Sequence, residues 1–421
     1  MMKRRIIAII LTAFIAVPAV ADNNGGSTYS RYGFGDLRYF TSNRGFAMGG
    51  VGIAILSPLS VDRMNPAAWG LLDRTRFSVG ALYEGFDADD GYLTAYYGKT
   101  HFNGLLLSMP VSPSNGIAVS LGITPYSKVN YNINDSQSQL GFDYHIQYLG
   151  EGGLALGHIG ASFRLAPNLY IGAKLNYYFG TIAQTITQKL TSTSRSNSEV
   201  IRTTSLHGIG MSAGATYAGL ARILGLPETH SLNIAAVFTN TTWLTVRDER
   251  VQNYTTSILL VSPLDTALAP ETKIPLPYSI AAGLAYSTDR ILIAADYHFQ
   301  QWSEVPVTDF NLTPLRNSQR IGAGLELMAR RDPLAPFSER VAYRIGAYYN
   351  ASYLVLNDVP INEYGVAAGI GFPVWGESRI NLGAQYGWRG TTENQLQKDR
   401  ILRISASMNI SEFWFNRPEE N

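Results

Sequence analysis

Apolar and polar residues alternate with a period of two along most of the chain. Between residues 169 and 179 every odd position is apolar, whereas Gly172, Lys174 and Asn176 between them are small or polar. A strand with this alternation has one face for an apolar environment and one face for water. Such runs therefore predict β-strands. The same pattern recurs at residues 77–83, 117–123, 232–238, 278–286, 291–299, 321–327, 341–349, 380–388 and 402–410.

The number and length of these runs indicate a membrane barrel. With weaker runs included they predict about fourteen to sixteen strands, many near the ~10 residues that a tilted membrane strand needs. After residue 21 no stretch reaches 18 consecutive apolar residues, so helical spans are not the main architecture. Because a bilayer offers no partner for an unpaired backbone group, strands that cross it must close on themselves. The fold class predicted is all-β, a transmembrane antiparallel β-barrel.

Connections between the predicted strands alternate in length. Residues 166–168 and 287–289 are short turns, which we expect to face the periplasm. Long polar stretches are expected to be external loops. They are residues 127–140, 181–202, 247–275 and 301–318.

The first residues predict export. Lys3, Arg4 and Arg5 precede an apolar run at residues 6–17, and Ala19-Val20-Ala21 fits a cleavage site. Residues 1–21 are therefore predicted to be a cleaved signal peptide, with the mature chain beginning near Asp22. The expected location is the outer membrane of a Gram-negative cell, where the surrounding lipids and the barrel-assembly machinery would be partners.

Composition excludes several other classes. Charged residues make up only 15% of the chain, whereas it has 40 glycines and 25 tyrosines, which suits strands that face two solvents. Without the three signal-peptide cations the formal net charge of +1 becomes −2, which gives no reason to expect a nucleic-acid partner. There is no cysteine, so disulfides do not hold the fold. The six histidines are scattered without metal-ligand spacing, and we expect no metal and no cofactor.

A glycine-rich segment precedes the first predicted strand. It contains Arg44, then Gly49 and Gly50 after Met48, then Asn65-Pro66-Ala67, and the strand run begins at Arg76. With a Gly-rich stretch at residues 150–154 that leads into a hairpin, this order resembles the FadL-type family of outer-membrane transport proteins. The resemblance implies a fourteen-stranded barrel, an N-terminal hatch folded into the lumen, and a sideways exit through a gap in the wall. The expected organisation is a signal peptide at 1–21, a hatch or plug at 22–74 and a barrel at 75–421.

Physical chemistry gives the hatch residues separate roles. Gly49 and Gly50 allow positive φ and close backbone contact, which a segment threading a lumen needs. Pro66 keeps Asn65 out of helical geometry, and the Asn65 side chain can satisfy backbone groups without water. Asn65-Pro66-Ala67 is therefore a candidate lumen anchor; the other interpretation of Asn-Pro alone is a plain surface turn.

Charged side chains at the strand positions that alternate with the apolar ones are expected to face the lumen. There they could hold the carboxylate of a fatty acid or another anionic end. The alternative for each is a solvated or ion-paired side chain. The candidates are Lys174, Arg344, Arg379 and Arg403.

The function predicted first is passive uptake of hydrophobic or amphipathic small molecules, such as long-chain fatty acids, with no enzyme activity. A second hypothesis keeps the fold and makes the chain a scaffold or shuttle component of protein secretion at the cell surface. A third is a membrane-embedded lipid hydrolase, because Gly210-Met211-Ser212-Ala213-Gly214 fits the G-x-S-x-G formula. The formula requires a strand-to-helix turn, and the strand-like surroundings of Ser212 argue against it.

Overall fold

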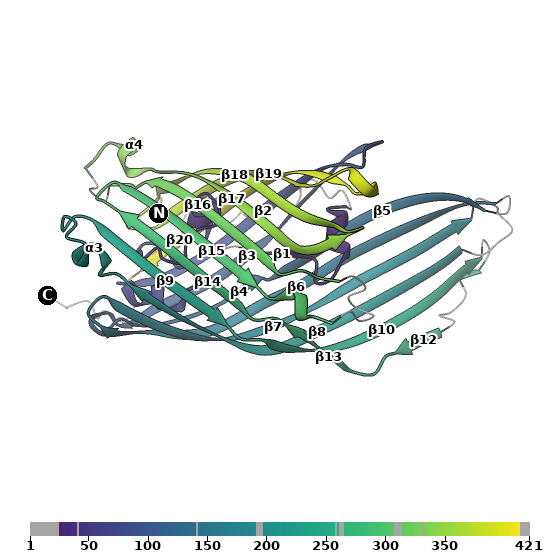
Figure 1. The fold of residues 1–421 in the computed structure, drawn as a ribbon, viewed down its shortest axis with the longest axis horizontal. Coiled ribbons are helices and arrows are strands. Elements are labelled where there is room, and N and C mark those ends of the chain that lie inside the picture. The colour runs from purple at the N-terminus through teal and green to yellow at the C-terminus, as the bar shows by residue number, and fades with distance from the viewer. Residues whose placement is uncertain are drawn as a thin grey trace, which may run out of the picture.

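The computed structural model shows a closed antiparallel β-barrel (Figure 1). It describes residues 25–39, 42–139, 142–190, 197–256, 259–260, 265–306, 314–330, 332 and 334–412. The predicted signal peptide, the predicted mature start at Asp22 and the aromatic residues 413–415 lie outside these ranges. Within the described ranges, no helix is long and apolar enough to span a membrane.

Within the described part of the chain, fourteen wall strands form the barrel. Seventeen segments build them, because three pairs of segments continue one another: β4 and β5, β9 and β10, and β13 and β14. β20 pairs with β2 along its whole length and closes the ring. The predicted fold class is therefore confirmed. The first seven wall strands are β2 (Thr75–Asp89), β3 (Thr94–Ser112), β4 (Ile117–Pro125) with β5 (Ser127–Gln139), β6 (Phe142–Ala166), β7 (Leu169–Leu190), β8 (Asn197–Tyr217), and β9 (Ser231–Thr239) with β10 (Thr242–Thr256).

The remaining wall strands complete the ring, and short helices connect several of them. The strands are β13 (Thr272–Leu276) with β14 (Ser279–Ser287), β15 (Ile291–Gln300), β16 (Ser318–Leu327), β17 (Ala342–Leu356), β18 (Val359–Pro373), β19 (Arg379–Gly390) and β20 (Lys398–Glu412). Two small strands, β11 (Leu259–Leu260) and β12 (Asp265–Leu268), pair with β10. The connecting helices are η4 (Pro113–Asn115), α3 (Leu220–Ile223), η5 (Trp302–Glu304), α4 (Phe337–Arg340) and η6 (Glu393–Gln395).

The alternation that predicts the strands also separates the two faces of the wall. On β7, Leu175 and Tyr177 point outward and are 49% and 47% exposed, whereas the alternating residues Lys174 and Asn176 are buried on the inside. The outer band is therefore apolar, as a lipid-facing surface requires. The polar side chains that alternate with the apolar ones face the lumen.

The prediction that residues 127–140, 181–202 and 247–275 are loops is wrong in large part. Residues 127–139 form β5, β7 runs to Leu190, β8 begins at Asn197, and β10 with β12 and β13 covers much of the third stretch. These segments carry polar residues on both faces, so the alternation of apolar and polar residues is weak. They still pair as strands because each has a neighbour to complete its ladder. In the fourth predicted loop, the described residues 301–306 and 314–317 lie outside the wall strands, and Ser318 begins β16.

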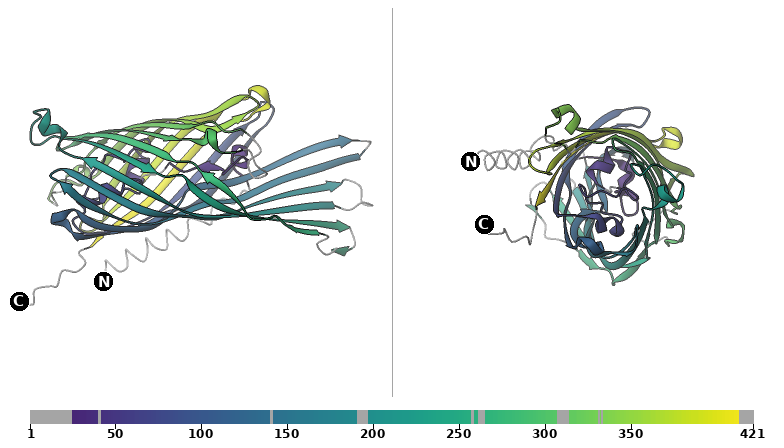
Figure 2. Two further views of the ribbon diagram at one scale, coloured as in Figure 1. Left: turned by 60° about the horizontal axis from the view of Figure 1, so that its bottom comes forward. Right: turned by 90° about the vertical axis from the view of Figure 1, so that its left-hand side faces the viewer.

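The longer strands project beyond the rest of the ring at one end, which we call the extended end (Figure 2). β6 has 25 residues, about 80 Å at ~3.3 Å per residue. Short turns lie at the opposite end, which we call the turn end. There Asn168 forms the β6–β7 turn with a φ of 63°.

The wall is split between β3 and β5. The ladder between β3 and β4 begins at Leu105 and runs to Ser112. β5 pairs with β6 along one edge, and its other edge pairs with the short strand β1 (Asp36–Leu37) at Ser127 and Lys128. The extended half of β3 is therefore joined to β2 but has no ladder to β5 among the described residues. This split matches the gap that the family resemblance implies.

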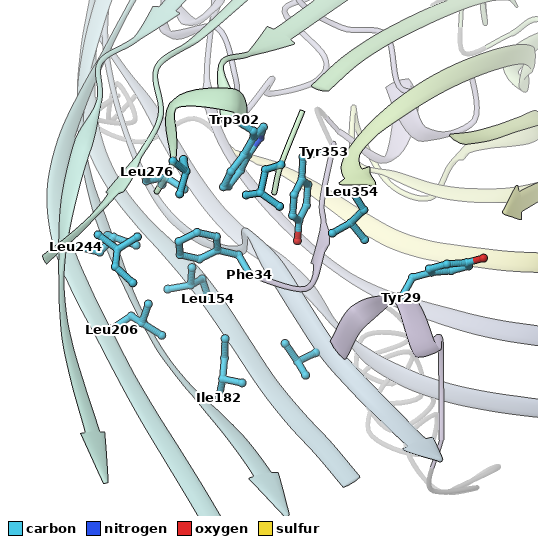
Figure 3. Close-up of a cluster of buried hydrophobic side chains, with 14 of the residues drawn as sticks. Tyr29, Phe34, Leu154, Ile182, Leu206, Leu244, Leu276, Trp302, Tyr353 and Leu354 are labelled. Atoms are coloured by element: carbon cyan, nitrogen blue, oxygen red, sulfur yellow. The ribbon is translucent and has the colours of Figure 1, made fainter. Parts of the chain in front are cut away.

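A hydrophobic cluster fills the barrel toward the extended end (Figure 3). Phe34 is fully buried, and its ring lies 5.4 Å from that of Trp302, which in turn stacks on Tyr353 at 4.7 Å. Leu154, Leu206, Leu244 and Leu276 from the wall surround them. The N-terminal segment is thus part of the core.

Candidate functional site

Residues 25–39 and 42–74, which we call the N-terminal segment, lie inside the ring of strands (right view of Figure 2). The segment contains η2 (Thr28–Arg31), β1, α2 (Asn43–Phe46) and η3 (Pro66–Leu71). It has few regular hydrogen bonds of its own, so the wall must satisfy its polar groups. Its contacts with the wall form the candidate site.

Gly49 and Gly50 bring the segment's backbone directly against the wall. Their φ values are +77° and +92°, which favour glycine. A Cβ atom on Gly49 would lie 2.3 Å from the carbonyl oxygen of Ala347 on β17. The wall also has a glycine at this contact, Gly346. A Cβ atom on it would lie 2.2 Å from the carbonyl carbon of Met48. Neither side has room for a larger residue.

Arg44 ties α2 to the wall through a carboxylate. Its Nε lies 2.5 Å from Oε2 of Glu326 on β16. Arg344 on β17 lies 3.4 Å from the other oxygen of Glu326 and donates to Asn381 at 2.9 Å. All three charged side chains are largely or fully buried, with 11% or less of each exposed. Two arginines thus share one carboxylate.

Asp296 on β15 accepts two backbone hydrogen bonds from the segment. Gly52 N and Ile53 N donate to its Oδ2 at 2.6 and 2.9 Å. The carboxylate thereby holds the turn that follows the Gly-Gly pair.

Asn65 is fully buried and bonds in three directions. Its Nδ2 donates to the carbonyl of Ile53 at 2.7 Å and to Thr216 Oγ1 on β8 at 2.8 Å. Its Oδ1 accepts from Ala67 N at 3.0 Å and caps η3, which begins at Pro66. One side chain therefore joins two parts of the segment to the wall.

The wall opposite Asn65-Pro66 consists of small residues. A Cβ atom on Gly214 would lie 2.4 Å from Asn65 Oδ1, and one on Gly172 would lie 2.5 Å from the Pro66 carbonyl carbon. The chain can reach the wall here because these two positions carry no side chain.

We expect Asn65→Ala to lower the free energy of unfolding by about 1–3 kcal/mol, because it leaves the Ile53 carbonyl and the Ala67 amide unsatisfied in a buried place. Urea unfolding in detergent micelles measures this. Asn115→Ala, at an exposed turn, is the control and should change the value by less than ~0.5 kcal/mol. Equal stability of the two variants would contradict the anchoring role.

Next to Asn65 lies a buried pair of opposite charges, Asp62 and Arg63. Asp62 accepts from Met64 N and Asn65 N at 2.7 and 2.8 Å. Burial raises the pKa of the Asp62 carboxyl and lowers the pKa of the Arg63 guanidinium to about 9. Lys174 on β7 donates to the Arg63 carbonyl at 2.6 Å. The predicted lumen cation Lys174 thus holds the segment's backbone.

Arg38 joins the segment to three strands through a chain of charges. It forms a two-point ion pair with Glu84 on β2, and Arg403 on β20 contacts the same carboxylate at 2.7 Å. Arg403 also pairs with Glu363 on β18 at 2.5 Å, and Glu363 accepts from Tyr348 at 2.7 Å. The predicted cation Arg403 therefore lies between two acidic side chains.

A second cluster lies closer to the extended end. Arg389 on β19 pairs with Asp36 at 2.8 Å and with Asp399 on β20 at 2.9 Å. Ser27 donates to Asp399 at 2.9 Å. Sequence reasoning missed this cluster and also Arg38 and Glu84. For Glu84, Arg389 and Asp399, a charged residue among the polar positions of a wall strand was a usable signal.

The N-terminal segment also fills the split in the wall. Asn130 on β5 exchanges hydrogen bonds with Ser30 and donates through Nδ2 to the carbonyl of Gly25 at 2.9 Å. Gly25 faces the ring of Tyr97 on β3, so closely that a Cβ atom there would lie 2.2 Å from the ring. The segment therefore bridges the two unpaired strand edges.

A cavity of ≈ 120 Å³ lies between the segment and the wall, beside the split. Leu37, Pro125 and Tyr126 border it on that side, and Lys174 and His298 border it on the other. Apolar cavities of about 150 Å³ are large enough for benzene. A long alkyl chain would not fit unless the segment moved.

The predicted lumen cations fall into separate places. Lys174 borders this cavity, Arg403 lies in the Arg38 cluster, and Arg344 and Arg379 line a different cavity at the turn end. Each has a partner within the protein; Arg379 donates to the carbonyl of Arg340 at 3.3 Å. Their binding of an anionic ligand stays a prediction.

A family model described as BamG matches residues 1–421, the full length of the sequence. The chain belongs to the BamG family. A search of curated proteins found no match.

Solved structures show which fold this BamG-family barrel shares. The CymD monoaromatic hydrocarbon channel matches with a TM-score of 0.58 at 15% identity, over 90% of this chain and 99% of that one. The toluene transporter TodX of P. putida matches with 0.58 at 16%, over 90% and 100%. A Pseudomonas aeruginosa FadL homologue matches with 0.55 at 14%, over 90% and 98%. At these identities the likeness shows the fold, and the resemblance to FadL-type barrels is confirmed at that level.

The hydrolase hypothesis finds no support in the BamG-family barrel. Ser212 lies within β8, not at a strand-to-helix turn. Its hydroxyl contacts Asn176 Nδ2 at 2.7 Å and Thr239 Oγ1 at 2.9 Å, which are not general bases. Among the described residues no group of three or more His, Asp or Glu side chains could hold a metal ion.

Proposed function

We propose that this chain is a permanently plugged outer-membrane barrel that acts as an interaction component of the barrel-assembly machinery and catalyses no reaction. The family name, BamG, points to that machinery. This is the second of the sequence-based hypotheses, a scaffold role on a FadL-type fold, with protein assembly in place of secretion.

The observation that carries the proposal is the way the N-terminal segment is fixed. Ion pairs join it to β2 through Arg38, to β16 through Arg44 and to β19 through Asp36. Removing one partner of a buried pair costs about 3–5 kcal/mol. A pore that opened in each transport event would have to break several such contacts at once, whereas a scaffold benefits from them.

The projecting strands offer a surface for a partner. Five strands, β5, β6, β7, β8 and β10, pass beyond the rest of the ring at the extended end. At ~4.8 Å between strands and ~33 Å for ten residues, one face of this sheet covers roughly 800 Å². That is about the area each partner contributes to a stable protein interface.

A depletion experiment tests the proposal. Cells that lose the protein should lose other barrel proteins from the outer membrane, and the tagged chain extracted in mild detergent should co-purify with known subunits of the assembly machinery. Uptake of labelled toluene and of a labelled long-chain fatty acid should not change. Normal levels of barrel proteins together with reduced uptake would contradict the proposal.

The cavity beside the wall split favours a second candidate function, passive uptake of small apolar molecules. The channels with the same fold are described as carrying monoaromatic hydrocarbons and toluene. At ≈ 120 Å³ the cavity is slightly smaller than the ~150 Å³ that holds benzene, so movement of Leu37 would have to widen it as well as connect it to the split. Long-chain fatty acids are the less favoured cargo on this geometry. If this function holds, Asn65→Ala should reduce uptake while the barrel still assembles.

A further inference from the structure

The part of β3 that borders the wall split has an open strand edge. On one side β3 pairs with β2 from Thr94 to Ser108. On the other side its ladder to β4 begins only at Leu105. Residues 94–102 therefore have a neighbouring strand on one side alone, over about 30 Å at ~3.3 Å per residue.

Backbone groups along this edge have no partner. In an antiparallel ladder successive residues direct their N–H and C=O groups alternately to the two sides. The hydrogen bond from Asp90 N to the carbonyl of Leu93, at the turn of the β2–β3 hairpin, sets the phase. Counted from this bond, Tyr96, Gly98 and Thr100 direct their backbone groups away from β2. Among the described residues no hydrogen bond reaches these groups.

The N-terminal segment does not occupy this edge. It touches β3 through the ring of Tyr97, which lies against Gly25. Across the split, Nζ of Lys128 on β5 lies 2.8 Å from Nδ1 of His101. Both contacts are made by side chains on the lumen face, so they leave the row of backbone groups open.

The two faces of the edge differ in polarity. Tyr96 and Phe102 point outward and are about half exposed, and Tyr92 at the hairpin turn is exposed as well. Lys99 is on the lumen face, opposite the buried Glu84 in the ladder. An apolar outer face and a polar inner face are what a membrane strand presents, so a neighbouring strand should have the same division.

A lysine at this edge also favours a partner with negative charge. Lys99 forms no hydrogen bond or ion pair among the described residues. The carboxylate opposite it, Glu84, is already paired with Arg38 and Arg403. A carboxylate on the lumen face of an added strand would therefore give Lys99 its counter-charge.

We propose that the open β3 edge, residues 94–102, binds an extended segment of another protein by strand addition. The segment has apolar residues on its outer side and polar residues, one of them acidic and opposite Lys99, on its lumen side. An added strand satisfies the row of open backbone groups along its whole length. The inference rests on the proposed function for the source of the segment, a barrel protein that has not yet closed and whose strands have this alternation.

A peptide with this pattern tests the proposal on the mature full-length protein in detergent micelles. The probe is a fluorescent ten-residue peptide in which valine and leucine alternate with serine and threonine, with one glutamate at a central polar position. Fluorescence anisotropy should show saturable binding. The same peptide with its central amides N-methylated lacks the donors for a ladder. It should bind about tenfold more weakly or worse, which corresponds to one or two hydrogen bonds.

Two variants locate the binding site. Lys99→Glu should weaken binding by about tenfold, and a peptide with lysine in place of its glutamate should restore it. Thr100→Pro removes an amide on the open side, where proline is tolerated in an edge strand, and should weaken binding similarly. Lys273→Glu, at an exposed position of β13, is the matched control and should bind as the wild type does.

Three outcomes would overturn the proposal. Wild-type protein that binds no peptide would show that Lys99 keeps other strands away, as lysines on edge strands can. Equal binding of the plain and the N-methylated peptide would show that no ladder forms. A dimer of the protein that Thr100→Pro dissociates would assign the edge to a second copy of this chain.

Failure of this inference and failure of the proposed function give different results. If the edge binds no peptide but depletion of the protein still removes other barrel proteins, strand addition is wrong and the assembly role stands. If the edge binds the peptide as described but depletion leaves barrel proteins unchanged, the assembly role is wrong and strand addition stands.

Discussion

Glu84→Ala should destabilise the folded barrel by about 3–5 kcal/mol and release the N-terminal segment from β2. Glu84 is 2% exposed and accepts from both Arg38 and Arg403, so its removal leaves two buried guanidinium groups with one carboxylate fewer. Urea unfolding of the protein in micelles gives the free energy. Limited proteolysis near Arg38 reports whether the segment has loosened.

The control variant removes one partner of a solvent-exposed ion pair. The side chains of Arg247 and Glu271 are 66% and 53% exposed, and surface pairs contribute about 0–1 kcal/mol. Glu271→Ala should therefore leave both readouts near the wild-type values. If Glu84→Ala behaved like Glu271→Ala, the charge clusters would not be what holds the segment.

Gly346→Ala should displace the N-terminal segment from the wall by adding a single methyl group. The new Cβ atom would lie 2.2 Å from the carbonyl carbon of Met48 and 2.5 Å from Gly49 N, and neither is the end of a flexible side chain. Overpacking of this kind costs about 1–3 kcal/mol. Because we propose that the segment plugs the lumen, we expect larger ion conductance in planar bilayers as well as lower stability.

Gly157→Ala on β6 is the matched control. There the nearest atoms to an added Cβ lie 3.8 Å away, which is ordinary contact. This variant should keep wild-type conductance and stability. Wild-type conductance from Gly346→Ala would show that the segment tolerates movement at its tightest contact.

The strands could be predicted because their alternation of apolar and polar residues is visible within a few neighbouring positions. Alternation along β7, β19 and β20 places each residue on the lipid or the lumen face without reference to the rest of the chain. The same criterion fails for residues 181–190 and 197–202. There polar residues occupy both faces of the strand, so the sequence loses its period while the ladder to the neighbouring strand continues.

The site is harder to predict because its contacts join distant parts of the sequence. Arg389 and Asp36 are 353 positions apart, and Arg38 and Glu84 are 46 apart. No local pattern pairs one charge with another over such separations. The Gly-Gly and Asn-Pro motifs were visible because backbone geometry limits which residues can stand there. The lumen arginines could be recognised as a set, but the partner of each arginine could not be predicted.

The central claim is that the protein works with its N-terminal segment fixed in place. The natural chain has no cysteine, so a designed disulfide between Ala47→Cys and Gly383→Cys would be unique. The Ala47 Cβ lies 3.4 Å from the position of a Cβ on Gly383, close to the ~3.8 Å of a disulfide. In cells that depend on this variant, we predict normal levels of outer-membrane barrel proteins with the bond oxidised. Loss of these proteins, reversed by reducing the bond, would contradict the account and assign the segment a moving role.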